Sequence, residues 1–569
     1  MYGFFVTNAK SNQGKDVLGE AKTLKYKDIQ FVYNPMPKFE QDKLFYEDSD
    51  KIVLLDGVIF NKRELMERTS GTWQDVFEGL YRDDPQTFFN GLRGSFCGAV
   101  LEKNSLRLTA FTNHSGEKTV YYTVQNGIFI VASHNNILTE ILRENNLPVR
   151  PDLTACQELV ALGSILHGKT PFQKVRRVTA GKYVKLINGQ SEEFRYHMFH
   201  NVPEHDLTLE ECIEELDKRF RKAVDRIFSK NKEYGYMGEC DLSGGLDSRM
   251  VTWVAHDLGF QNIANVCYCQ SGNIDHTTSR RIARDLGNEY VFLPMNGGDF
   301  LTEVDEVVDK FGGQVSYLIC TGANRAMKEL RNKNIFLCAT GLLGELHNAY
   351  WVEGEKHTAP AYTALRYSSV IDYTVPAEYS VGYENYEQMN LYEFSALLFL
   401  SSSLVRQQQA EVTSPFIDVD YLEFAYRIPL RWRQNYGLTK AWMVSKYPKA
   451  ASYVWQTKRM PVSYAYYNKI YWPKVAGDVR RFFVRCINKV GRTLHVPIQI
   501  SQRTDMNPFD LWYRTNPSLR EFVTDYYEKN ISRVQDPVLL HILMETFSKG
   551  AARDKLQVIN LLAVYKRYF

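Results

Sequence analysis

The stretch Ser243-Gly244-Gly245-Leu246-Asp247-Ser248 decides how this 569-residue sequence is interpreted. The apolar run 234–242 before it is predicted to form a strand, and residues 250–258 after it are predicted to form a helix. Two adjacent glycines allow a tight turn and a close approach of the backbone to a ligand. The free N–H groups and positive dipole end of a following helix favour an anion. With two serine hydroxyls and the Asp247 carboxylate, the stretch predicts a pyrophosphate-binding turn that carries a metal ligand.

A second stretch has the spacing of a different phosphate-binding loop. Residues 163–170 place two glycines, a lysine and a threonine as nucleotide-binding P-loops do. That motif requires a strand before it and a helix that continues from the lysine. Here the preceding run 153–162 is predicted to be helical, and Pro171 keeps Thr170 out of the helical region. We interpret this stretch as a loop that leaves a helix.

Composition narrows the classes of protein that this chain can represent. A net charge of +3 over 569 residues indicates neither a nucleic-acid-binding protein nor a membrane partner. The nine cysteines are scattered without a metal-binding spacing, which is typical of reduced thiols in the cytoplasm. The first residues lack the pattern of a signal peptide, and no apolar run is long enough to span a bilayer. We therefore expect a cytoplasmic protein without membrane insertion, which could form a homodimer.

Three regions are expected along the chain. Residues 1–195 show short strands with turns and helices, typical of an α+β layered domain with antiparallel hairpins. Residues 208–465 alternate strands with longer helices, which predicts an α/β domain with a doubly wound parallel sheet. The Ser243 turn then lies at the carboxyl ends of the strands, where such sheets bind ligands. Residues 466–569 are expected to be a helical extension; its basic stretch 469–492 is interpreted as a solvated helix face or, alternatively, a contact for an anionic partner.

Several short fragments occur in a recognisable order. Residues 56–61, 92–96 and 111–122 in the first half, and 414–418 in the second, resemble segments of the asparagine synthetase family. The hexapeptide 243–248 resembles the PP-loop of ATP pyrophosphatases, which cleave ATP to AMP and pyrophosphate. The resemblance covers roughly residues 1–465 and rests on the order and spacing of the fragments. It implies a class II glutaminase domain of the Ntn-hydrolase αββα type, followed by a PP-loop synthetase domain.

The first half departs from this family at the residues that hydrolyse glutamine. The family uses an N-terminal cysteine, whereas Tyr2 stands here, and a phenol does not replace a thiolate at neutral pH. Asp56 stands where an asparagine completes the family's oxyanion hole, and a carboxylate is no donor. Trp73 stands where an acidic residue binds the α-amine of glutamine. We therefore expect a member without glutaminase activity, as in β-lactam synthetase and lasso-peptide cyclases.

The second half resembles the family more fully. Residues 339–345 align with its second acidic loop, so Glu345 joins Asp247 as an expected Mg²⁺ ligand. Lys458 resembles a lysine that neutralises the adenylate and the tetrahedral intermediate, and with Glu345 it is an expected catalytic residue. Leu342 stands where the family has a residue that helps to deprotonate the amine, which leucine cannot do. The expected ATP-binding residues are Leu242, Ser243, Gly244, Gly245, Leu246, Asp247, Ser248 and Gly341.

The resemblance implies an ATP-dependent carbon–nitrogen ligase that uses ATP and Mg²⁺. A carboxylate would attack the α-phosphorus of ATP, and ammonia or another amine would then displace AMP to form an amide. Asparagine formation from free ammonia is the simplest version. The carboxylate could instead belong to a small molecule, a peptide or a sugar. The alternatives are intramolecular amide formation like that of β-lactam synthetase or lasso-peptide cyclases, amidation of a sugar carboxylate, and an inactive ATP-binding scaffold.

Overall fold

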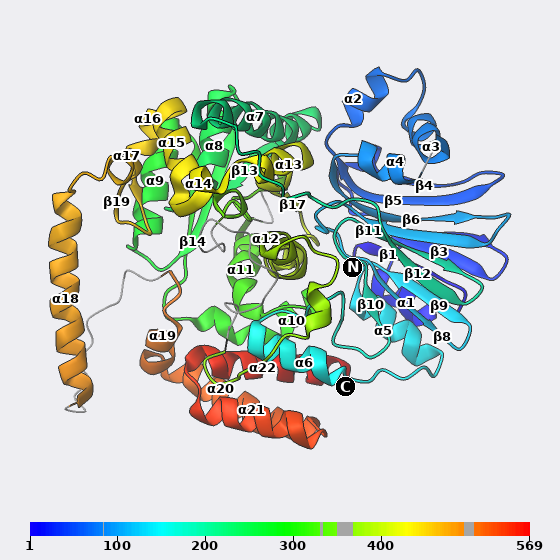
Figure 1. The fold of residues 1–569 in the computed structure, drawn as a ribbon. Coiled ribbons are helices and arrows are strands. Elements are labelled where there is room, and N and C mark those ends of the chain that lie inside the picture. The colour runs from blue at the N-terminus through cyan, green and yellow to red at the C-terminus, as the bar shows by residue number, and fades with distance from the viewer. Residues whose placement is uncertain (84, 331–333, 350–367, 494–505) are drawn as a thin grey trace.

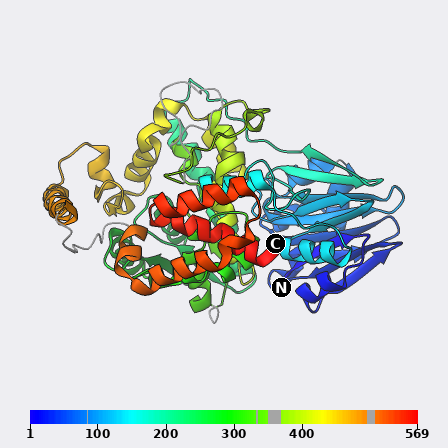
Figure 2. The ribbon, with the colours of Figure 1, turned by 90° about the horizontal axis from the view of Figure 1, so that it is seen from below.

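The computed structural model describes residues 1–83, 85–330, 334–349, 368–493 and 506–569. A β-sandwich built from the first part of the chain lies beside a second body that contains a parallel sheet (Figure 1). The N-terminus lies where the two bodies meet, and the C-terminus lies close to it (Figure 2). The interface between the bodies therefore includes residues from both ends of the chain.

Within the described residues, two antiparallel sheets of six strands each form the sandwich. The first sheet has the order β10 (Arg176–Arg177), β8 (Tyr121–Gln125), β9 (Ile128–Ala132), β1 (Gly3–Thr7), β3 (Ile29–Asn34) and β2 (Lys22–Tyr26). The second has the order β12 (Gln190–Arg195), β11 (Lys182–Ile187), β7 (Arg107–Thr112), β6 (Gly94–Glu102), β5 (Lys51–Ile59) and β4 (Leu44–Glu47). The antiparallel hairpins expected from the sequence are confirmed.

Helices cover both outer faces of the sandwich. They are α1 (Asn12–Leu18) and α5 (Asn135–Glu144) on the first sheet, and α2 (Lys62–Glu67), α3 (Trp73–Asp83) and α4 (Pro85–Gly91) on the second. Phe4 and Phe31 pack between the sheets, whereas their neighbours Phe5 and Val32 pack beneath α5. Successive side chains of a strand point to opposite faces. This alternation gives each sheet two buried faces and produces the expected αββα layers.

A parallel sheet of five strands, counted over the described residues, forms the centre of the second body. Its order is β15 (Glu289–Pro294), β14 (Ile263–Cys269), β13 (Met237–Asp241), β16 (Ile335–Ala339) and β17 (Glu411–Thr413). All neighbouring strands are parallel. The chain begins in the centre of the sheet and winds outward in both directions, so the doubly wound parallel sheet is confirmed.

Helices cover both faces of this sheet as well. One face carries α7 (Leu209–Glu233) and α8 (Asp247–Asp257), and the other carries α10 (Val304–Phe311) and α11 (Thr321–Leu330). Ile263 packs in the core beneath α7 and α8, whereas the next residue, Ala264, packs in the opposite core. The sequence also predicts a helix over 323–332. This helix is α11, and residues 331 and 332 lie outside the described residues.

The remaining helices and short strands surround the second body. They are α6 (Leu153–Leu162), α9 (Ile274–Leu286), α12 (Tyr386–Asn390), α13 (Val419–Arg427), α14 (Leu430–Arg433), α15 (Gly437–Lys446), α16 (Pro448–Ala451), β18 (Val454–Trp455), β19 (Met460–Pro461) and α17 (Val462–Tyr466). The last part of the chain is helical, with α18 (Trp472–Thr493), α19 (Phe509–Thr515), α20 (Pro517–Asn530), α21 (Pro537–Lys549) and α22 (Ala552–Tyr568). Among the described helices, none combines the length and apolar character needed to cross a membrane.

Buried charges join the two bodies. Lys118 Nζ, between β7 and β8, lies 2.8 Å from the carboxylate of Glu411 in β17 and 3.5 Å from that of Asp56 in β5. Tyr33 donates a hydrogen bond of 2.6 Å to Asp56. Burial alone would lower the pKa of Lys118, but the charges of Glu411 and Asp56 raise it above its usual value. The Lys118 ammonium therefore lies between two carboxylates, and Lys43 adds a second positive charge 3.8 Å from Asp56.

Replacing this cation (Lys118→Met) is expected to destabilise the protein by about 3–5 kcal/mol, because the two carboxylates would remain buried beside an apolar side chain. Urea unfolding followed by tryptophan fluorescence measures the change. Lys529→Met is the matched control, because Lys529 pairs with Asp525 at an exposed position of α20. The control should lose less than about 1 kcal/mol. An equal loss in both variants would contradict the assigned role of Lys118.

Candidate functional site

The turn between β13 and α8 is held by its own serines. Ser243 N–H donates to Ser248 Oγ at 3.1 Å, and the two hydroxyl oxygens also lie 3.1 Å apart. Gly245 N–H donates to Ser243 Oγ at 3.1 Å, and Gly244 N–H donates to the Asp275 carboxylate at 2.9 Å. These bonds fold the backbone tightly at the carboxyl end of the central strand. The predicted strand, turn and helix are therefore confirmed.

Arg249, in the first turn of α8, fixes a distant segment against this turn. Its buried guanidinium donates to the carbonyl oxygen of Gly244 at 3.1 Å and to that of Val454 at 2.7 Å. It also donates to the carbonyl oxygens of Ala450 and Tyr453, both at 3.1 Å. A planar guanidinium with several donors suits such a multiple contact. The loop that contains Lys458 is thereby held beside the turn.

The loop after β16 contacts the turn through its glycines. A Cβ atom at Gly341 would lie 2.4 Å from Ser248 N, and one at Gly344 would lie 2.4 Å from Asp247 Cγ. No side chain fits at either distance, so glycine lets the two loops meet directly. Glu345, the next residue, is consequently placed near Asp247 without any sequence proximity.

Asp247 and Glu345 form a half-buried pair of carboxyl groups. Burial and the nearby charge of Glu345 raise the pKa of Asp247 to about 8, and burial raises the pKa of Glu345. Asp247 Oδ1 is buried and has no hydrogen-bond partner among the described residues. Two neighbouring carboxyl groups with an unbonded oxygen suit a divalent cation. Mg²⁺ binds one or two carboxylates and completes its coordination shell with phosphates and water. The two residues therefore fit the expected metal. Over the described residues, no group of three or more metal-binding side chains occurs.

A cavity of about 300 Å³ lies over this pair, at the carboxyl ends of β13, β14 and β16. Its volume is at the lower end of the range for ligand sites. Of the residues expected to bind ATP and metal, those that line it are Leu242, Ser243, Gly245, Asp247, Ser248, Gly341 and Glu345. Gly244 and Leu246 belong to the same turn but are not among the lining residues, and Leu246 packs in the core beneath α8.

Lys458 lines a second cavity, of about 840 Å³, together with Trp455 and Thr457, whereas Gln456 between them lines the first. Lys440 and Lys469 line it too, and burial together with the charge of Lys458 lowers the pKa of Lys440. In the described part of the chain, none of these three ammonium groups forms an ion pair. An anionic ligand is the group that such a cavity fits. The structure thus places Lys458 beside the nucleotide-sized cavity rather than in it.

A polar cluster at the edge of the first cavity escaped the sequence analysis. Arg406 donates to Asp241 at 2.7 Å and to the Tyr268 hydroxyl at 2.9 Å. Burial and the charge of Asp241 raise the pKa of the neighbouring Glu239 to about 8. Two acidic residues at alternate positions of an apolar strand were the available signal. Arg406 could not have been assigned to them, because it is 165 residues from Asp241 in sequence.

The N-terminal pocket is filled by side chains from the second body. Tyr2 N–H donates to Gln408 Oε1 at 3.0 Å, and Gln408 Nε2 lies 3.1 Å from His134 Nε2. The remaining cavity is about 30 Å³ and is also lined by Asp56 and Cys97. Burial and the charge of Asp56 raise the pKa of the Cys97 thiol well above its usual value. The pocket is too small for a glutamine side chain. The Cys97 thiol beside it is not a reactive thiolate, because its pKa is raised.

The structure places Trp73 away from the pocket at Tyr2. Trp73 begins α3, its side chain packs in the outer core of the second sheet, and its indole N–H donates to the Asp42 carbonyl at 3.0 Å. It is not among the residues that line the pocket at Tyr2. An amphipathic helix buries its large apolar residues against the sheet that it covers, and this determines the position of the tryptophan.

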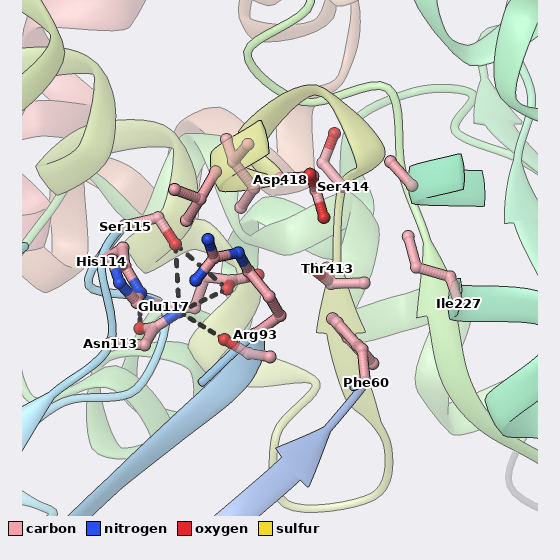
Figure 3. A pocket seen from close by; sticks show the side chains of 14 residues that line it. Phe60, Arg93, Asn113, His114, Ser115, Glu117, Ile227, Thr413, Ser414 and Asp418 are labelled. Atoms are coloured by element: carbon pink, nitrogen blue, oxygen red, sulfur yellow. Dashed lines mark hydrogen bonds between the residues drawn. The ribbon is translucent and has the colours of Figure 1, made fainter. Parts of the chain in front are cut away.

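A small pocket of about 20 Å³ lies between the two bodies, where the β7–β8 connection meets β17 (Figure 3). Glu117 points into it and accepts hydrogen bonds from Asn113 at 2.7 Å and Ser115 at 3.1 Å. Burial raises the pKa of Glu117 to about 7. This volume has room for a molecule the size of water, so the pocket is too small to hold a nucleotide.

The first body contains a recognisable domain. Residues 38–197 match the sequence model of a family described as "Glutamine amidotransferase domain". The chain is 24% identical over 274 residues to amidase chyE of Penicillium rubens, covering 46% of this chain and 36% of that protein. It is 28% identical over 180 residues to the glutamine-hydrolysing asparagine synthetase of Homo sapiens, covering 27% of this chain and 31% of that protein. The chain thus spans about a third of the length of these two relatives.

Two solved structures are also similar in part. A B. subtilis glutamine phosphoribosylpyrophosphate amidotransferase has a TM-score of 0.27 at 8% identity, covering 52% of this chain and 91% of that one. An NH3-dependent NAD synthetase from Campylobacter jejuni has a TM-score of 0.18 at 21% identity, covering 24% of this chain and 60% of that one. At these scores neither likeness supports an argument about the fold or the function.

Adding one methyl group at the contact between the loops (Gly344→Ala) is expected to weaken the binding of ATP with Mg²⁺ by at least about tenfold, because overpacking of this kind typically displaces backbone. Titration calorimetry measures the affinity. Gly79→Ala in α3 is the control, because a Cβ there meets no atom within 4 Å. Unchanged binding in Gly344→Ala would show that the contact is not required.

The pH dependence of the free energy of unfolding is expected to show the raised pKa of Glu117. The folded chain retains this proton up to about pH 7, whereas an unperturbed glutamate has a pKa of 4.5. The stabilising contribution is therefore complete below about pH 4.5 and is lost as the pH rises through about 7, by at most about 1.4 kcal/mol per pH unit. Glu117→Gln should flatten this slope in urea unfolding measured across the range. Glu20→Gln, at an exposed position, should leave the slope unchanged; equal slopes in all three proteins would contradict the assignment.

Proposed function

We propose that this protein is an ATP-dependent carbon–nitrogen ligase that activates a carboxylate as an acyl-adenylate and transfers it to an amine. The observation that carries the proposal is the 300 Å³ cavity, which is lined by the serine turn and by the half-buried Asp247 and Glu345 carboxyl groups. A helix N-terminus preceded by a glycine turn binds phosphate groups, and paired carboxylates bind the cation that accompanies them. The matches to an amidotransferase domain and to part of an asparagine synthetase support the same class.

The chain's own residues provide for each requirement of this reaction. Ser243 and Ser248 would donate hydrogen bonds to the phosphates, and Asp247 and Glu345 would hold Mg²⁺, which when bound neutralises phosphate charge. The carboxylate oxygen attacks the α-phosphorus, and the bond to the leaving pyrophosphate breaks. The amine nitrogen then attacks the acyl carbon, and AMP leaves as the amide forms. Lys458, at the boundary of the two cavities, would stabilise the negative charge of the intermediate.

The second cavity supports a substrate with more than one negative charge. Its three unpaired lysines exceed what one activated carboxylate requires. Its other lining residues include the exposed Asn435 and Asn468, whose side-chain amides can both donate and accept hydrogen bonds. A sugar acid or an acidic peptide satisfies these features better than a small amino acid in a cavity of about 840 Å³.

The amine in this proposal is not produced by hydrolysis of glutamine within the chain. Tyr2 replaces the nucleophile, Gln408 occupies the pocket beside it, and Asp56 is tied to Lys118 and Tyr33. Free ammonia or an amine of the substrate would reach the adenylate instead.

A scaffold that binds ATP without catalysing a reaction is the second candidate. The observation in its favour is Leu342, which lines the nucleotide-sized cavity where the resemblance expects a residue that accepts a proton. Leucine cannot do so, and a scaffold would release no pyrophosphate with any carboxylate.

Pyrophosphate release tests the proposal. Purified protein with ATP, Mg²⁺ and a panel of sugar acids, acidic peptides and amino acids is expected to form AMP and pyrophosphate in equal amounts with at least one of them. Asp247→Asn should lower this rate by at least about a hundredfold, because a metal ligand and its charge are lost. Asp257→Asn, at the other end of α8, should retain the wild-type rate. If no carboxylate leads to pyrophosphate release while ATP still binds, the result would favour the scaffold.

Glutamine provides a separate arm of the same experiment. Glutamate should not accumulate when glutamine is added, and ammonium chloride or a substrate amine should support amide formation in its place. Release of glutamate that depends on this protein would contradict the proposed inactivity of the first body.

A further inference from the structure

Helix α18 has an apolar side that is recognisable from its spacing. Trp472, Val475, Val479, Phe482 and Phe483 recur three or four residues apart within Trp472–Thr493. Residues at these spacings share one face of a helix. An apolar face of this length normally packs against a core.

Within the described residues, the rest of the chain leaves this face uncovered. Trp472 is 73% exposed, Phe482 64% and Phe483 60%. Both views show α18 standing apart from the sandwich and from the parallel-sheet body (Figures 1 and 2). Exposed apolar surface of this extent marks an interaction site in a folded protein.

The charge of the segment is strongly positive. Its sequence contains four arginines and two lysines against one acidic residue, Asp478. Lys474 follows Trp472 by two positions and therefore projects from a different side of the helix than the tryptophan. Lys469, just before the helix, adds to the same charge. The helix thus combines an exposed apolar face with an excess of cations.

We propose that α18 lies in the surface of an anionic membrane, with its apolar face among the acyl chains and its basic residues at the lipid phosphates. Amphipathic helices with lysine and arginine on one side and tryptophan and phenylalanine on the other bind in this way. Each basic residue near an anionic leaflet contributes attraction. Tryptophan at the start of the helix and the exposed Tyr467 before it suit the polar–apolar boundary.

The charge decides between a membrane and the other occupants of such a face. A second copy of α18 would bring the same excess of positive charge into contact, which repels at short distance. Anionic lipids neutralise that charge and also accept the apolar side chains. This inference does not depend on the proposed ligase reaction, since binding needs neither ATP nor a carboxylate.

A single exposed thiol allows a direct test on the full chain. Cys486 in α18 is exposed, whereas the other eight cysteines are buried. An environment-sensitive fluorophore attached there is titrated with vesicles of phosphatidylcholine, alone or mixed with phosphatidylglycerol, and flotation measures binding independently. We expect a blue shift and flotation with the anionic vesicles only, and a loss of affinity as salt is raised.

Two double variants separate the contributions. Phe482→Ser with Phe483→Ser should weaken binding to anionic vesicles by at least about tenfold, since two aromatic side chains that would enter the bilayer are lost. Lys474→Glu with Arg480→Glu should weaken it and reduce its salt dependence. Val538→Ser with Met544→Ser, which removes exposed apolar side chains from α21, should bind as the wild type does.

The proposal is overturned if anionic vesicles do not bind, or if the Phe482 and Phe483 variant binds as well as the α21 control. Sedimentation velocity without lipid tests whether the apolar face of α18 instead joins two copies of the chain. A dimer that dissociates in the Phe482 and Phe483 variant, with no vesicle binding by either protein, would assign the face to contact between copies of the chain.

Discussion

The close contact between the serine turn and the loop after β16 is the constraint on which the nucleotide-sized cavity depends. Since β13 and β16 are parallel neighbours, the loops at their carboxyl ends meet, and Gly341 and Gly344 let the backbones approach without side chains between them. This approach brings the half-buried Asp247 and Glu345 together, and the pKa values of both are raised. Like charges are unfavourable there, and in the proposed reaction a bound Mg²⁺ ion would relieve this repulsion.

The segment 406–411 links this cavity to the N-terminal pocket. Arg406 binds Asp241 at the edge of the cavity, Gln407 donates to the Glu117 carbonyl, and Gln408 bonds to Tyr2. Glu411 then pairs with Lys118. These contacts take the volume of the N-terminal pocket and bury several charges between the bodies. In the proposed reaction, the sandwich acts as a rigid neighbour of the synthetase-like body and supplies no ammonia.

The sequence predicted those features that local periodicity encodes. The short strands of the first half and the strand–turn–helix at Ser243 depend on neighbours in the chain. The layered first region and the doubly wound sheet of the second followed from them. Features that depend on distant partners were accessible only where the family resemblance placed them, as with Glu345 and Asp247. The packing of Trp73 beneath α3 and the contact of Arg406 with Asp241 had no such signal in the sequence. The basic stretch 469–492 was recognised as a helix, but its exposed apolar face is visible only once the rest of the chain is placed.

The hexapeptide at Ser243–Ser248 by itself determined that a turn of two glycines ends a strand and opens a helix, because the geometry of that turn is set by the residues within it. It also determined which side chains could meet phosphate and a cation. Tertiary structure alone decided that Glu345 meets Asp247, that Lys458 lines the adjacent cavity, and that Gln408 fills the pocket at Tyr2. These pairs are far apart in sequence, and only the packing of sheet, loops and interface brings them within reach.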